Sequence, residues 1–134
     1  MDKPSIPEDI RRFVLTSIPS VPFLEALLLM HADPARPWRK DTLAQRLYVR
    51  EKTADSLLAD LCAAGMAAPC EPVGGKLAAD GFCYHPESEA LRGRIDRLAD
   101  LYATHLVEVT LLIHSSLDRK AQQFADAFKW RKDS

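Results

Sequence analysis

The chain has 134 residues, of which 47% are hydrophobic, and its formal net charge at pH 7 is −1. This is one domain's length with enough apolar material to fill a core, which excludes an intrinsically disordered chain. The near-zero net charge excludes a globally basic or acidic protein, so any charged binding surface has to be local.

The apolar runs of the sequence are short. The opening residues, MDKPSIPEDI, have no apolar signal region, and FLEALLLM and LVEVTLLI are each interrupted by a glutamate. Both runs fall well below the roughly 20 residues that a membrane helix needs. The cysteines, Cys62, Cys70 and Cys83, are odd in number and lack metal-ligand spacing, which is typical of a reducing compartment. We therefore expect a cytoplasmic protein without membrane association.

Two helices are predicted in the first part of the chain. Pro7 and the acidic residues after it favour a helix start, and the helix is expected over residues 7–18. Its apolar positions at helical spacing are Ile10, Phe13, Val14 and Ile18. Pro22 opens a second helix that is apolar almost all round, which is typical of a central core helix.

The stretch TLAQRLYVREKTADSLLADLCAAGMA, Thr42 to Ala67, predicts two short helices around a tight turn. Asp41 is the expected N-cap of the first helix, because its carboxylate can accept a backbone N–H of the first turn. The second helix is expected over residues 51–64, and Gly65 is expected to end it in the left-handed conformation. Its expected buried face comprises Ala54, Leu57, Leu58 and Leu61.

After Gly65 the pattern changes to that of a hairpin. MAAPCEPVGGKLAADGFCYHP contains prolines, paired glycines and a short aromatic run, which suits two strands with a loose tip. Helices followed by a hairpin are in winged-helix order. The expected fold is therefore mainly α with a small β-hairpin wing: a winged helix-turn-helix domain with an N-terminal helix over residues 1–85, followed by a long C-terminal helical extension.

Residues 86–134 are predicted to form the extension. From Pro86 onward, apolar side chains recur at alternating steps of four and three over more than three heptads, which is typical of a helix that packs against a second copy. The expected homodimer contacts are Leu91, Ile95, Leu98, Tyr102, His105, Val109 and Leu112. A short amphipathic helix with Leu117, Phe124 and Phe128 on one face is expected to follow.

From Thr42 to Ala67 the sequence resembles bacterial winged-helix transcription regulators of the MarR and PadR groups. The matching frame is LAQRL, the turn YVR, EKTADSLLADL, the closing Gly65, and MAA before the first wing strand. These families place a hairpin wing after the recognition helix and dimerise through long helices that flank the core. The resemblance covers half of the chain and implies a DNA-binding regulator that acts as a homodimer.

Charge is distributed unevenly along this motif. Residues 36–52 carry six basic and two acidic side chains, whereas residues 53–75 carry three acidic and no basic ones. The recognition helix thus has Asp55 and Asp60 where a DNA reader usually has Arg or Lys, and the turn has Tyr48 where the family often has Gly. The expected DNA contacts, with phosphate contacts at the front of the motif, are Lys40, Thr42, Arg46, Arg50, Lys52, Thr53, Ser56 and Lys76.

An alternative function follows from the acidic recognition helix. A winged helix of this kind could serve as a protein-interaction module that binds a basic partner through its acidic face. A third possibility is control by a small molecule bound in the apolar junction between the long helix and the core.

The remaining chemistry-bearing residues favour structural roles. The four histidines have no i, i+3 or i, i+4 partners and no metal-ligand spacing, so we expect no metal, cofactor or catalysis. His105 is interpreted as an interface or core histidine, with a pH-sensitive dimer contact as the alternative. Cys70 and Cys83 fall in the two expected strands; inert thiols are favoured over a redox pair, because only Lys76 is near enough in sequence to activate them.

Overall fold

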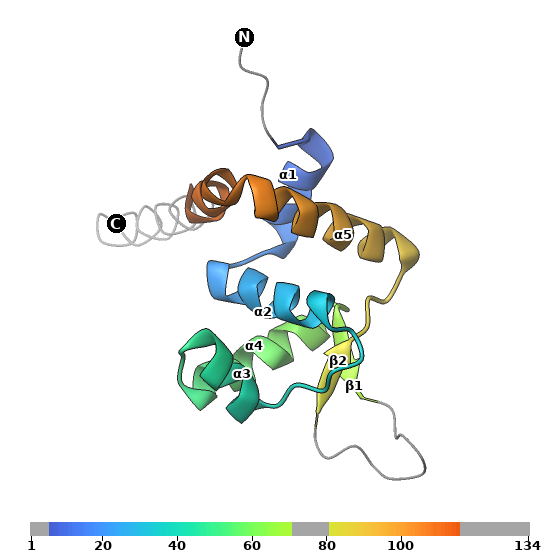
Figure 1. The fold of residues 1–134 in the computed structure, drawn as a ribbon. Coiled ribbons are helices and arrows are strands. Elements are labelled where there is room, and N and C mark those ends of the chain that lie inside the picture. Colours follow the sequence, from blue (N-terminus) through green and yellow to red (C-terminus); the bar gives the residue numbers. More distant parts are fainter. Residues whose placement is uncertain (1–5, 71–80, 116–134) are drawn as a thin grey trace, which may run out of the picture. The chain divides into compact units, whose positions relative to one another are not determined.

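The structure, a computed structural model, describes residues 6–70 and 81–115 of the chain (Figure 1). These residues form mainly helices and one small antiparallel sheet, as predicted. The chain divides into two compact units, one of residues 22–99 and one that combines residues 1–21 with residues 100–134. Each unit is described by itself.

The unit of residues 22–99 is built on α2 (Val21–Ala32), α3 (Lys40–Leu47) and α4 (Glu51–Ala63), together with most of α5 (Glu89–Thr104). The central helix α2 buries most of its surface, including Phe23, Leu24, Ala26, Leu27 and Met30. Helix α4 buries Ala54, Leu57, Leu58 and Leu61, which is the predicted face. Because these faces meet in one core, the polar sides of α3 and α4 are left exposed.

The predicted hairpin is present. Strands β1 (Ala67–Pro69) and β2 (Phe82–Tyr84) pair antiparallel, with Ala67 opposite Tyr84. Trp38, in the connection between α2 and α3, adds a third segment to the edge of β2: the backbone N–H of each of Trp38 and Phe82 donates to the carbonyl oxygen of the other at 2.8 Å. The hairpin therefore holds the connection that leads into α3.

Left-handed backbone occurs at two positions of the helix-turn-helix motif. Gly65 has φ +74° and ends α4, as predicted. Tyr48 has φ 58° and ψ 43° at the end of α3, and its side chain is 95% exposed. The turn thus adopts the left-handed conformation that favours glycine, which is common at this position in the families that the sequence resembles. Here the position is occupied by tyrosine, whose β-carbon makes this conformation less favourable.

The predicted long helix is interrupted. Helix α5 (Glu89–Thr104) ends before His105, and a second helix follows at Leu106–Ser115. The Thr104 hydroxyl lies 2.7 Å from His105 Nδ1 and 3.3 Å from the Leu101 carbonyl oxygen. A threonine hydroxyl that competes for backbone carbonyls in this way bends helices, which gives a local reason for the interruption.

The second unit contains α1 (Glu8–Ser17) and Leu106–Ser115. Among residues 6–21 and 100–115 of this unit, the buried side chains are Ile10, Phe13, Val14, Ile18, Val109 and Ile113. Those of α1 are the residues predicted from its periodicity. Among the described residues, no single helix is both long and apolar enough to cross a membrane, and α1 and α2 pass such a test only when counted together across the break between them.

Candidate nucleic-acid interface

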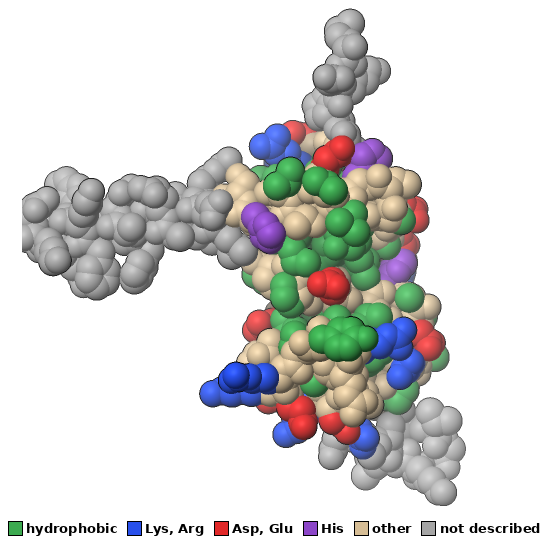
Figure 2. Space-filling view, turned by 60° about the vertical axis from the view of Figure 1, so that its left-hand side comes forward, with side chains coloured by type: hydrophobic (Ala, Val, Ile, Leu, Met, Phe, Trp, Pro, Cys, Tyr) green, Lys and Arg blue, Asp and Glu red, His purple; other side chains and the backbone are tan. Residues whose placement is uncertain are grey.

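The basic residues predicted to contact DNA lie at the two ends of α3 and at the start of α4, in the helix-turn-helix motif. Lys40 lies at the start of α3, Arg46 lies in its last turn, and Arg50 and Lys52 lie at the start of α4. All four side chains are exposed, as are those of the predicted contacts Thr53 and Ser56. Figure 2 shows basic and acidic side chains interspersed on this part of the surface. The predicted contact Lys76 lies outside the described residues.

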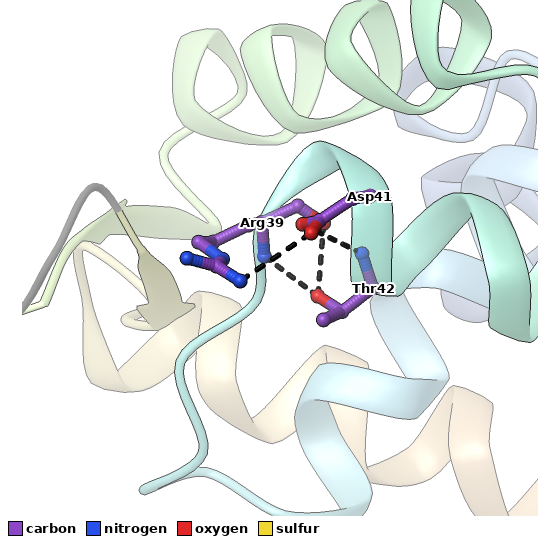
Figure 3. A network of polar contacts seen from close by, with 3 residues as sticks. All are labelled: Arg39, Asp41 and Thr42. Atoms are coloured by element: carbon purple, nitrogen blue, oxygen red, sulfur yellow. Dashed lines mark hydrogen bonds and ion pairs between the residues drawn. The ribbon is translucent and has the colours of Figure 1, made fainter.

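The start of α3 differs from the prediction (Figure 3). The helix begins at Lys40, so Arg39 and not Asp41 is in the N-cap position. The Thr42 hydroxyl accepts the backbone N–H of Arg39 at 3.0 Å, and the Asp41 carboxylate accepts the backbone N–H of Thr42 at 2.9 Å. Side chains within the first turn thus accept backbone N–H groups at the helix start, as a capping side chain at the N-cap position would do. Thr42 is therefore a helix-start residue whose hydroxyl is already bonded.

Arg39 and Asp41 also form an ion pair. Arg39 Nη2 lies 3.3 Å from Asp41 Oδ2, and both side chains are about half exposed, at 50% and 46%. A solvent-exposed pair of this kind contributes little stability, on the order of 0–1 kcal/mol. Its main consequence is that the Asp41 charge is compensated locally, which leaves Lys40 as an unneutralised cation at the start of α3.

The start of α4 is favourable for anions. Its N-cap, Arg50, is extended and makes no side-chain capping hydrogen bond to the described first turn. The first N–H groups of a helix carry the positive end of its dipole, and without a capping side chain they can donate to an anion. Arg50 and Lys52 add two cations at the same place, and the exposed Glu51 carboxylate in the first turn opposes them in part.

A groove of about 620 Å³ lies between these helix starts and the hairpin. It is lined by Arg39, Lys40, Asp41, Glu51, Asp55, Leu58, Pro69, Gly81 and Phe82. Leu58, Pro69 and Phe82 supply apolar surface. Glu51 and Asp55 are exposed, and neither forms an ion pair with another described residue. Sequence reasoning did not predict this groove, because its walls come from three separate segments.

The predicted dimer contacts are mostly core residues. Leu91, Ile95, Leu98 and Val109 are at most 9% exposed within one chain, and Tyr102, His105 and Leu112 are half-buried. A side chain that is already covered gains no further burial when a second copy binds, so the seam predicted through the four buried residues is at odds with their burial. The exposed large apolar residues of this region are Leu106, Val107 and Leu111.

A polar cluster that the sequence did not reveal joins α2, β2 and α5. His31 Nε2 lies 2.8 Å from Asp96 Oδ1, and the His31 ring meets the edge of the Tyr84 ring at 5.5 Å. Burial, together with the nearby Asp96 carboxylate, raises the pKa of Tyr84 to about 12, although the Arg92 guanidinium 5.5 Å above the ring opposes the shift. In the described part of the chain, no group of three or more His, Cys, Asp or Glu residues could hold a metal ion.

The cysteines of the hairpin are not inert thiols. Cys70 and Cys83 form a disulfide, with their Cα atoms 5.1 Å apart, so the favoured sequence interpretation is wrong. The signal was present in the predicted hairpin, because strand pairing sets Cys83 opposite Ala68, and Cys70 follows two positions later as a diagonal cross-strand neighbour. Cys62 is a free thiol, and burial raises its pKa.

Comparison with known protein families finds no matching family, and comparison with curated proteins finds no match.

Proposed function

We propose that the chain is a DNA-binding transcription regulator that acts as a cytoplasmic homodimer and has no catalytic role. The observation that carries the proposal is the set of four exposed cations, Lys40, Arg46, Arg50 and Lys52, at the two ends of α3 and at the start of α4 in a helix-turn-helix motif. The hairpin that follows α4 supports it, because it stands in the position of a wing.

Phosphate contacts would supply most of the affinity. Four contacts in each protomer would give a slope of log affinity against log salt of about −3.6 per protomer, or about −7 for a dimer on two half-sites. The uncapped start of α4 adds backbone N–H donors to the same contact.

Base contacts would come from the exposed side of α4. Glu51, Asp55 and Ser56 are exposed there. A carboxylate can accept a hydrogen bond from the N4 amino group of cytosine in the major groove, so we expect a preference for C·G pairs facing the start of α4.

A second candidate function is favoured by the groove. Its apolar surface from Leu58, Pro69 and Phe82 lies beside the carboxylates of Glu51 and Asp55, which gives this part of the groove the character of a site for a basic side chain on another protein. Arg39 and Lys40 also line the groove and oppose such a side chain. A lysine or arginine could place its aliphatic stem on the apolar surface and its charge beside the carboxylates.

The first experiment is retardation of a pool of duplex genomic fragments at low salt. Changing Arg46, Arg50 and Lys52 together to alanine should weaken binding on the order of 100-fold, because three charge-assisted contacts are lost. The matched control changes Arg11, Arg12 and Arg94, which are also exposed but lie on α1 and α5, and removes the same charge. Equal loss in both variants, or no retarded fragment with the unaltered protein, would refute DNA binding through this motif.

A further inference from the structure

The disulfide joins the end of β1 to β2. Cys70 directly follows β1, and Cys83 is the middle residue of β2. The Cys70 N–H also donates to the Gly81 carbonyl oxygen at 3.0 Å. Each strand has only three residues, and so short a hairpin is marginally stable without further support. The covalent link therefore adds to the packing on α4 and to the Trp38–Phe82 hydrogen bonds that hold these short strands.

Cys83 also faces the connection between α2 and α3. Its Sγ lies 3.7 Å from the carbonyl oxygen of Arg36 and 4.0 Å from that of Ala35. A disulfide sulfur carries no proton, so these are packing contacts in the oxidised state, whereas the reduced thiol can turn its proton toward either oxygen. Reduction thus replaces a fixed contact with a weak, rotatable hydrogen bond.

The same connection leads directly to the candidate interface. Phe82, next to Cys83, exchanges two 2.8 Å backbone hydrogen bonds with Trp38. Trp38 is 2% exposed, and Lys40 follows two residues later at the start of α3. Pro69 and Phe82 line the groove together with Lys40. The position of the hairpin therefore determines both one wall of the groove and the path of the chain into α3.

We propose that Cys70 and Cys83 are a reversible thiol–disulfide switch, which fixes the hairpin against the α2–α3 connection when oxidised and loosens it when reduced. Its effect on DNA binding rests on the function proposed above. In a reducing compartment, a protein disulfide is usually a redox-sensing or catalytic one, and not a permanent link.

The oxidant belongs to the class of low-molecular-weight disulfides. The thiolate of one cysteine attacks a sulfur of the small disulfide, which forms a mixed disulfide and releases one small thiol. The second protein thiolate then attacks the protein sulfur of the mixed disulfide, which forms the Cys70–Cys83 bond and releases the second small thiol. Two electrons pass from the protein thiols to the small disulfide, and their two protons end on the released thiols.

Cys62 provides an internal contrast. It is the third thiol of the chain and is half-buried in α4, where burial raises its pKa. A higher thiol pKa means less thiolate at neutral pH and slower exchange. The Cys62→Ser variant therefore keeps the hairpin pair and removes the competing thiol, and it is the background for the test.

The test equilibrates the full chain carrying Cys62→Ser in glutathione buffers from reducing to oxidising. Alkylation and mass measurement give the oxidised fraction, and amide hydrogen exchange at Trp38 and Phe82 reports the hairpin contact. We expect one reversible two-electron transition, with exchange at both amides about tenfold faster in the reduced state. The variant with both Cys70 and Cys83 changed to serine should exchange rapidly in every buffer. A pair that never oxidises, or equal exchange in both states, would overturn the switch.

DNA affinity is then measured for the oxidised and reduced forms, and we expect about fivefold weaker binding on reduction. The double serine variant should bind with one affinity in all buffers. If exchange depends on redox state but neither form binds DNA, the switch stands and the proposed function fails. If both forms bind DNA equally well, control of DNA binding by the switch is refuted.

Discussion

Neutralising the two free carboxylates of the groove separates the two candidate functions. The variant is Glu51→Gln with Asp55→Asn, which keeps side-chain size and the groove's apolar surface. A carboxylate about 7 Å from a phosphate costs roughly 0.6 kcal/mol by Coulomb's law in water, so removal of both should strengthen non-specific DNA binding by about 1.2 kcal/mol, or roughly eightfold. Binding of a basic peptide should instead weaken, because its two counter-charges are lost.

Fluorescence anisotropy with a labelled duplex and with a labelled lysine- and arginine-rich peptide measures both changes at low salt. The gain on DNA should shrink at physiological salt, where the Debye length is about 8 Å. The control, Glu25→Gln with Asp33→Asn, makes the same charge change at exposed residues that do not line the groove. If the groove variant and the control strengthen DNA binding equally, the carboxylates do not lie beside the DNA, and this reasoning is wrong.

Four further predictions concern stability. Tyr48→Gly removes a left-handed backbone cost of about 1 kcal/mol, part of which is offset by the freer unfolded chain, so the Tm should rise by about 1–3 °C in thermal unfolding. Cys83→Ser opens the link to Cys70 across a sequence separation of 13 and should lower the free energy of unfolding by about 3 kcal/mol in urea titrations without reductant, with no change under reductant. Leu98→Ala should cost about 2–5 kcal/mol to the same extent at low and high protein concentration, since Leu98 is fully buried in one chain; a cost that depends on concentration would instead place it in a dimer contact. Tyr84 has its pKa raised from 10 to about 12, so the unfolded chain loses this proton first and stability falls as pH rises from about 10 to about 12; Tyr84→Phe should flatten that part of the stability curve.

Local patterns predicted the parts of the fold that depend on local physics. The buried face of α4 follows from helical spacing, and Gly65 ends that helix because glycine tolerates φ +74°. The hairpin follows from prolines, glycines and an aromatic run. Each of these features is encoded within a stretch of roughly 20 consecutive residues or fewer, which is why one sequence suffices to predict them.

Features that depend on chain segments far apart were not predicted. The pair of His31 and Asp96 joins residues 65 positions apart, and no periodicity marks either of them. The dimer seam through Leu98 stays a prediction: a heptad pattern indicates an apolar face, but it does not say whether that face packs within one chain or against a second copy. The start of α3 was misplaced by two residues because Thr42 caps it from inside the first turn.

The connection between α2 and α3 has more influence on the candidate interface than its sequence suggests. HADPARPW indicates only that a helix ends, since its prolines and aspartate break helical periodicity. In the structure, the Arg36 guanidinium lies 4.4 Å above the Trp38 ring, Trp38 pairs with Phe82, and the carbonyl oxygens of Ala35 and Arg36 face the sulfur of Cys83. This short segment thus links the disulfide to the first turn of α3. A substitution in this connection should therefore change DNA or peptide binding even where the substituted residue contacts neither ligand. Its effect should depend on the redox state of the hairpin.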